Sequence, residues 1–166
     1  MLVAAPALLL GAVVTTPAAA APTSLADAPA PSIAEVVAAN PDAAQVDDRT
    51  VSFDGGAVVL TYPDAAQDGL AMRAAASSAS CPSGWFCLYD GAGYSGRMLQ
   101  FRDCGVTQSL HTYGFARSAS SWANKRTRSV YVYAGGSTIW AAYAGQSAYS
   151  VDAADNDRAD AVRLGC

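Results

Sequence analysis

The chain has 166 residues, a formal net charge of −4 and a pI near 4.7, and 52% of its residues are hydrophobic. This length accommodates one modest domain with appendages. Binding to nucleic acid rewards clustered Lys and Arg, so the acidic balance argues against nucleic acid and also against an anionic membrane surface as partners. One basic cluster, Lys125, Arg126 and Arg128, lies between two strand-like runs, a position typical of a solvated hairpin tip.

We expect the N-terminus to be a secretory signal peptide. Residues 2–14 form an apolar run that is too short to span a bilayer, because a spanning helix needs roughly 20 residues. Small residues at positions 17–21 are typical of a cleavage site, so we interpret residues 1–20 as a signal peptide that is cut after Ala20. No Lys or Arg precedes the apolar run, and an uncleaved anchor is the alternative. The interpretation predicts a secreted, extracellular protein without a membrane contact after cleavage.

Export permits disulfide bonds. The four cysteines, Cys81, Cys87, Cys104 and Cys166, allow three pairings. Zinc binding is the alternative use of these thiols, but their uneven spacing lacks the paired Cys-x-x-Cys elements of structural zinc sites. We therefore expect bridged and chemically inert cysteines.

Residues 21–63 are predicted to contain a helix over 33–39 and a hairpin over 50–62. Ser32 and Glu35 form a capping box, and Asn40-Pro41 ends the helix. Two β-prone runs flank Asp54-Gly-Gly, which predicts the hairpin turn. Such a small segment rarely stands alone, so it either packs on the following domain or serves as a pro-region. Residues 64–80, rich in Ala and Ser, predict a linker.

Residues 81–166 predict an all-β domain. β-branched and aromatic residues recur in short runs, and no helical stripe of useful length is present. The predicted strands cover residues 86–89, 97–101, 130–133, 138–143, 148–151 and 161–164. This pattern favours a sandwich of two motifs.

One motif in this domain is specific. Tyr89, Tyr94 and Gly96 follow the pattern aromatic, four residues, aromatic, one residue, glycine. A folded-over hairpin uses all three, because Gly96 adopts a positive φ without strain and the ring of Tyr89 then covers the backbone there. With Cys81-Pro-x-Gly-x-x-Cys87 before it, the motif resembles the Greek-key signature of the βγ-crystallin superfamily. In particular, it resembles the secreted peptidase inhibitors of actinobacteria, of the streptomycete metalloproteinase inhibitor type.

The resemblance implies two Greek keys in a βγ-crystallin-like sandwich over residues 81–166. It also implies the disulfide Cys81–Cys87, and with it Cys104–Cys166. The second Greek-key motif is degenerate in this sequence. In the family the reactive bond lies in a second cysteine-bridged loop, which this sequence lacks, so the inhibitory residues do not transfer. Our candidates are Lys125 and Arg126, in an exposed turn over 124–127, or the turn over 144–147.

Catalysis and metal binding have little support. His111 is the only histidine, it lies in a loop-like segment, and no phosphate loop or zinc motif is present. Calcium-binding members of the βγ-crystallin superfamily, which the motif resembles, carry two Asn or Asp residues, two spacers and then Ser/Thr-Ser in each motif. Here residues 116–121 retain only the serines and residues 156–161 only the acidic pair, so one weak composite calcium site with Ser120, Asn156 and Asp157 remains conceivable. We expect no other cofactor.

The leading hypothesis is a monomeric, disulfide-stabilised binding protein without enzyme activity that inhibits an extracellular peptidase, of the metalloproteinase type. One alternative is an extracellular crystallin-like structural or weakly calcium-binding protein. The other alternative is a carbohydrate- or surface-binding module that uses Trp85.

Overall fold

The computed structural model describes residue 1, residues 30–64 and residues 79–166. The proposed signal peptide, apart from residue 1, and most of the proposed linker lie outside the described residues. None of the helices in the described part of the chain is long and apolar enough to cross a membrane.

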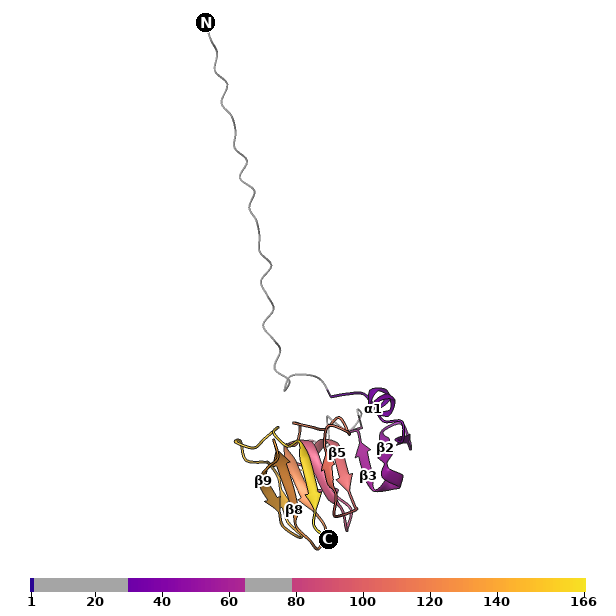
Figure 1. The fold of residues 1–166 in the computed structure, drawn as a ribbon, viewed down its shortest axis with the longest axis vertical. Coiled ribbons are helices and arrows are strands. Elements are labelled where there is room, and N and C mark those ends of the chain that lie inside the picture. Colours follow the sequence, from indigo (N-terminus) through magenta and orange to yellow (C-terminus); the bar gives the residue numbers. More distant parts are fainter. Residues whose placement is uncertain (2–29, 65–78) are drawn as a thin grey trace.

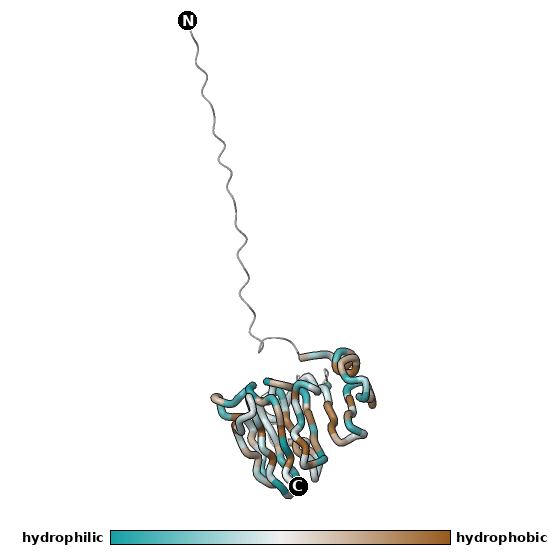
Figure 2. The backbone as a smooth tube through the Cα atoms, in the orientation of Figure 1, coloured by the Kyte–Doolittle hydropathy of each residue, from teal (hydrophilic) through white to brown (hydrophobic). Residues whose placement is uncertain are grey.

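Two antiparallel sheets form the structure (Figure 1). In spatial order, the first sheet contains β1 (Ala44–Gln45), β2 (Thr50–Phe53), β3 (Val58–Thr61), β5 (Ser95–Phe101), β4 (Phe86–Gly91), β7 (Ser121–Asn124) and β10 (Ser147–Ala148). The second sheet contains β6 (Thr107–Ser109), β11 (Ala161–Leu164), β8 (Val130–Ala134) and β9 (Ser137–Ala142). Hydrophobic positions are spread along the strands of both sheets (Figure 2), and their buried side chains form one main core.

Strands β4–β7 and β8–β11 form two Greek keys. In each motif the third strand leaves its own sheet: β6 pairs with β11, and β10 pairs with β7. The predicted all-β sandwich of two Greek-key motifs is confirmed. The strand predictions missed β6 and β7, and the predicted strand over 148–151 is instead Ser147–Ala148. All four residues of β7 are buried, including two polar ones, so this strand lacks the alternation by which strands are recognised.

Gly96 supports the folded hairpin between β4 and β5. Its φ is +77°, and a Cβ atom there would overlap the carboxylate of Asp90. The atoms nearest to that added Cβ belong to Asp90 and Gly91, neighbours that the expectation about the Tyr89 ring does not include. The buried Tyr89 ring meets Tyr94 edge-on, with ring centroids 5.6 Å apart. Burial also raises the pKa of Tyr89 to about 12.

The carboxylate beneath Gly96 is held by Arg97. Asp90 accepts hydrogen bonds from the Arg97 backbone N–H and from Nε, each over 2.6 Å. The guanidinium also donates to the carbonyl of Gly114 over 3.0 Å. It lies 5.8 Å from the ring centroid of Tyr62 and 5.1 Å from that of Phe115. Arg97 is only 4% exposed, so these partners must offset the cost of removing its charge from water.

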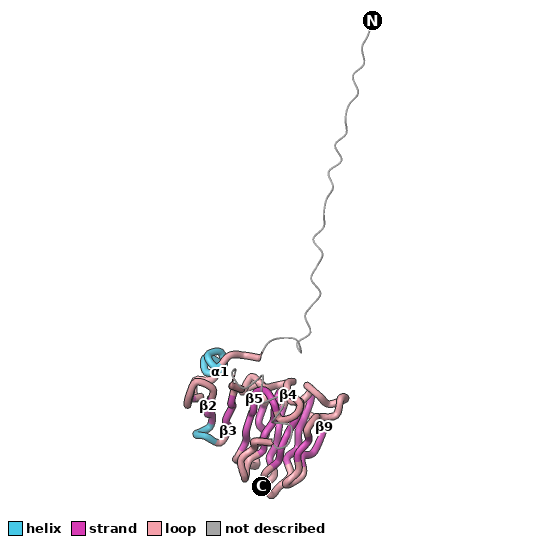
Figure 3. The backbone as a smooth tube through the Cα atoms, turned by 180° about the vertical axis from the view of Figure 1, so that it is seen from behind, coloured by secondary structure: helices cyan, strands magenta, loops and turns pink. Residues whose placement is uncertain are grey.

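The N-terminal segment, residues 30–64, extends the first sheet. Its helix α1 (Ile33–Ala39) begins at the Ser32–Glu35 capping box, and β3 pairs with β5 (Figure 3). Side chains alternate between buried and half-buried along β2 and β3. The buried ones are Val51 and Phe53 of β2 and Val58 and Leu60 of β3. These belong to the same core as the two Greek keys. The hydroxyl of Tyr62 donates to the carbonyl of Pro31 over 2.6 Å and so joins the two ends of the segment.

The second motif has a shorter hairpin than the first. Gly135 and Gly136, with φ of +57° and +80°, form a two-residue turn between β8 and β9. The aromatic-to-glycine spacing of the first motif therefore has no counterpart there. The loops before β7 and β11 nevertheless bond to each other reciprocally. Arg117 N donates to the Ala159 carbonyl, and Asp157 N donates to the Ala119 carbonyl.

We predict that Gly96→Ala lowers the free energy of unfolding by about 3 kcal/mol, because left-handed strain adds to the overlap with Asp90. Gly136→Ala is the matched control: φ is nearly the same, but no atom lies within 4 Å of the added Cβ. It should cost about 1 kcal/mol. Urea unfolding of both variants measures the difference, and equal losses would contradict this explanation of Gly96.

Candidate functional site

Five segments meet at one end of the sandwich, which we call the disulfide end: residues 81–85, 102–105, 125–129, 143–146 and 165–166. They meet there because β4 begins opposite the end of β7, and β8 begins opposite the ends of β9 and β11. The C-terminus marks this end in Figure 1, and α1 lies toward the opposite end. Both disulfides are here: Cys81–Cys87 and Cys104–Cys166.

The disulfides make this end rigid. Their Cα atoms are 5.8 and 5.3 Å apart, within the ordinary range. Cys104–Cys166 spans 62 residues and in the chain-entropy model contributes about 4 kcal/mol. The short Cys81–Cys87 loop is further paired with the turn after β7, because Gly84 N donates to the Lys125 carbonyl and Lys125 N to the Trp85 carbonyl, each over 2.9 Å.

Asn124 connects two turns of the disulfide end. Its side chain is fully buried, and its amide nitrogen donates to the carbonyls of Arg128 and Ala142 over 2.9 and 2.8 Å. Its amide oxygen accepts from Arg126 N over 3.1 Å, and its backbone N–H donates to the Gln146 carbonyl over 2.8 Å. Asn124 is thus the buried last residue of β7, which corrects the expectation that it lies in an exposed turn.

Arg126 points back onto the protein. Its guanidinium donates to the carbonyls of Gly84, Arg102 and Gly165, which belong to three segments of the disulfide end. Burial lowers the pKa of Arg126 below its ordinary value. Lys125, the other predicted inhibitory residue, is exposed. The structure therefore leaves Lys125 available to a partner and uses Arg126 to cross-link the segments that surround it.

The second predicted turn lies beside the first. Gln146 N donates to the Tyr143 carbonyl over 3.1 Å, and Gly145 has a φ of +73°. All residues from 143 to 147 are exposed, and Tyr143 is 59% exposed. Asn124 bonds to both sides of this turn, at Ala142 and Gln146. No pattern in the sequence indicates this role, because a buried Asn and an Asn in an exposed turn cannot be told apart from one sequence.

The predicted calcium ligands come together in the loops before β7 and β11. Ser120 Oγ donates to Asp157 Oδ1 over 3.3 Å, and Asn156 Nδ2 donates to Asp157 Oδ2 over 2.6 Å. Both carboxylate oxygens thus already accept hydrogen bonds. Within the described part of the chain no three His, Cys, Asp or Glu side chains gather as a metal site would require.

The remaining residues of interest are spread over the structure. His111 is exposed on the loop after β6. Trp122 is 8% exposed and contributes to the core, and Trp140 packs against it. Trp85 is half-buried at the disulfide end, where the Arg102 guanidinium lies 5.6 Å from its ring centroid. A glycan that stacks on this face of the Trp85 ring would therefore have to displace Arg102.

We predict that Asn124→Ala lowers the free energy of unfolding by about 3 kcal/mol, because two carbonyls and one N–H lose their buried side-chain partner. The Arg126 amide should also exchange its hydrogen faster, as measured by NMR. Asn156→Ala is the control, since that amide makes one bond to a neighbouring side chain. Unchanged protection of the Arg126 amide in Asn124→Ala would refute the role given to Asn124.

A family model described as peptidase inhibitor family I36 matches residues 74–149. The search of curated proteins found no match. One solved structure, described as "Evolution of the eye lens beta-gamma-crystallin domain fold", aligns with 14% sequence identity and a TM-score of 0.45. The alignment covers 54% of this chain and 93% of that chain. The resemblance to a peptidase inhibitor family is confirmed: residues 74–149 carry the signature of peptidase inhibitor family I36.

Proposed function

We propose that this protein binds and inhibits an extracellular peptidase, of the metallopeptidase type, through its disulfide end. The match to peptidase inhibitor family I36 is the observation that supports inhibition. The inhibitor acts as a secreted monomer and without catalysis of its own. Two disulfides are compatible with an oxidising, extracellular location.

The disulfide end suits an inhibitor because binding there orders little further chain. An inhibitory loop gains affinity when the free protein already holds it in the bound conformation. Asn124 and Arg126 each bond to several segments there, Cys104–Cys166 joins two of them, and Cys81–Cys87 ties a third to β4. The exposed side chains of Lys125 and Tyr143 then contact the peptidase.

The N-terminal segment belongs to the active inhibitor in this proposal. Val51, Phe53, Val58 and Leu60 are each at most 4% exposed, and each is part of the main core. Removing them as a pro-region would uncover apolar surface along β5 and cost several kcal/mol per side chain.

A panel of purified peptidases tests the function. We expect the oxidised full-length protein to inhibit at least one metallopeptidase with an inhibition constant below about 1 µM, as interfaces of standard size allow. Reduction of both disulfides should weaken this inhibition, because the disulfide end loses its cross-links. If every metallo- and serine peptidase in the panel stays fully active in excess protein, the proposed function is wrong.

Two matched pairs of variants test the surface. Lys125→Ala and Tyr143→Ala should each weaken inhibition at least tenfold, which is about 1.4 kcal/mol. Arg158→Ala and Tyr131→Ala remove exposed residues of the same kinds outside the disulfide end and should change inhibition less than threefold. If both variants at the disulfide end still inhibit but a control variant does not, the peptidase contacts another surface of the protein, and the proposed one is wrong.

A further inference from the structure

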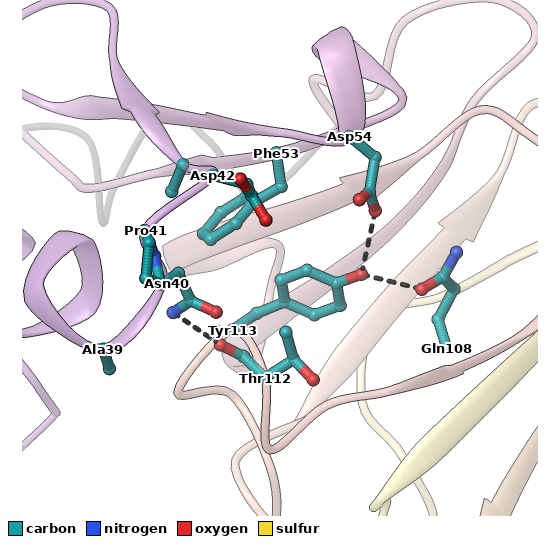
Figure 4. Close-up of a pocket in the computed structure, with 10 residues that line it drawn as sticks. Ala39, Asn40, Pro41, Asp42, Phe53, Asp54, Gln108, Thr112 and Tyr113 are labelled. Carbon is teal, nitrogen blue, oxygen red and sulfur yellow. Dashed lines mark hydrogen bonds between the residues drawn. The ribbon is translucent and has the colours of Figure 1, made fainter.

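A cavity of about 280 Å³ lies between the N-terminal segment and the loop that follows β6 (Figure 4). The rings of Phe53 and Tyr113 form its apolar floor, with centroids 4.9 Å apart and planes at 75°. Both residues are at most 4% exposed. Figure 4 shows Asp42 and Asp54 on the side of the N-terminal segment, with Gln108 across the Tyr113 hydroxyl from Asp54. The cavity is open to solvent on the side of these carboxylates, since both aspartates are exposed.

Two of the side-chain hydrogen-bond donors in the cavity, on Asn40 and Tyr113, are already used. Asn40 Nδ2 donates to the carbonyls of Val36 and Thr112 over 2.8 and 2.9 Å. The Tyr113 hydroxyl donates to Gln108 Oε1 over 2.7 Å, and Asp54 Oδ2 lies 3.5 Å from the same hydroxyl. Burial and the Asp54 carboxylate raise the pKa of Tyr113 to about 12, so this hydroxyl stays protonated and neutral near pH 7.

The acceptors, in contrast, are largely free. Asp42 has no hydrogen bond or ion pair with any residue that the structure describes, and Asn40 Oδ1 accepts no hydrogen bond from that part of the chain. No Lys or Arg is among the residues that line the cavity. The Gln108 amide nitrogen and the Thr112 hydroxyl are the remaining side-chain donors there. The cavity therefore offers two carboxylates and an amide oxygen above an aromatic floor.

We propose that this cavity binds an alkyl guanidinium or ammonium group, the chemistry of an arginine or lysine side chain. The cationic head donates hydrogen bonds to Asp42, Asp54 and Asn40 Oδ1, as charge-assisted bonds favour. Its methylene stem covers the apolar floor. An anion meets two like charges here, and an uncharged apolar ligand leaves the acceptors without donors.

The size of the cavity supports the same class of ligand. Small-molecule sites usually enclose about 300 to 1,000 Å³, so this cavity lies at the lower end of that range and has room for one such side chain. A metal ion fits less well, because the described part of the chain holds no cluster of three His, Cys, Asp or Glu side chains. The inference stands independently of peptidase inhibition, since the cavity lies outside the disulfide end.

Titration of the oxidised full-length protein with Nα-acetyl-arginine amide tests the proposal. The NMR signals of the Asn40 and Gln108 side-chain amides report binding. We expect saturable shifts with a Kd of about 1 mM. Nα-acetyl-citrulline amide has nearly the same shape without the charge and should bind at least tenfold more weakly. Equal binding of the two compounds, or no saturation with either, would overturn the proposal.

Variants separate the cavity from the general charge of the protein. Asp42→Asn combined with Asp54→Asn should weaken binding of the arginine derivative at least fivefold. Asn suits position 54, where φ is +50°. Asp48→Asn combined with Asp152→Asn removes the same charge from residues outside the cavity and should leave binding unchanged. An equal loss in both double variants contradicts a specific site.

The source of the cation is distinguished by comparing agmatine with the peptide Gly-Gly-Arg-Gly-Gly. Tighter binding of the peptide supports the site and identifies a polypeptide side chain as its ligand. Equal binding supports the site and identifies a small free amine. Failure of both ligands to bind refutes it, whether or not the protein inhibits a peptidase.

Discussion

The ion pair between half-buried Asp90 and buried Arg97 joins three parts of the molecule that lie far apart in the sequence. The carboxylate fills the space beneath Gly96 and so fixes the first hairpin. The guanidinium donates to the loop carbonyl of Gly114 and lies 5.1 Å from the ring centroid of Phe115 and 5.8 Å from that of Tyr62. Loss of one partner of such a pair costs about 3–5 kcal/mol, because the other charge remains buried. The hairpin, the Greek-key loop and the N-terminal segment therefore depend on one interaction.

Asn124 has a comparable role at the disulfide end. There too, hydrogen bonds of a buried polar side chain hold the exposed turns over residues 125–129 and 143–146 in place. Buried polar groups must be satisfied, so a change in either turn leaves an orphan donor or acceptor. The proposed inhibitory surface thus belongs to a rigid scaffold. The cation-binding cavity lies instead where the N-terminal segment packs on the loop after β6.

The sequence predicts the all-β fold because Tyr89, Tyr94 and Gly96 are a local signal with one physical solution. It does not reveal that the Asp90 carboxylate lies against Gly96. That contact depends on the register shift between Tyr89 and Gly91 in the pairing of β4 with β5, which the sequence does not show. Asn124 was missed as a buried residue because its partners, Ala142 and Gln146, are about 20 residues away. Pairing of β3 with β5 was likewise not predicted, because nothing local specifies which edge a hairpin joins.

We infer that residues 30–64 and the two Greek keys form one cooperative unit. Native-state hydrogen exchange of the oxidised full-length protein tests it most directly, because exchange by global unfolding is the same for every strand in a unit. We expect the amides of β3 that bond to β5 to be as protected as those that join β4 to β7. Exchange in β3 that is orders of magnitude faster, while β4 and β7 stay protected, would contradict the claim and favour a separable N-terminal segment.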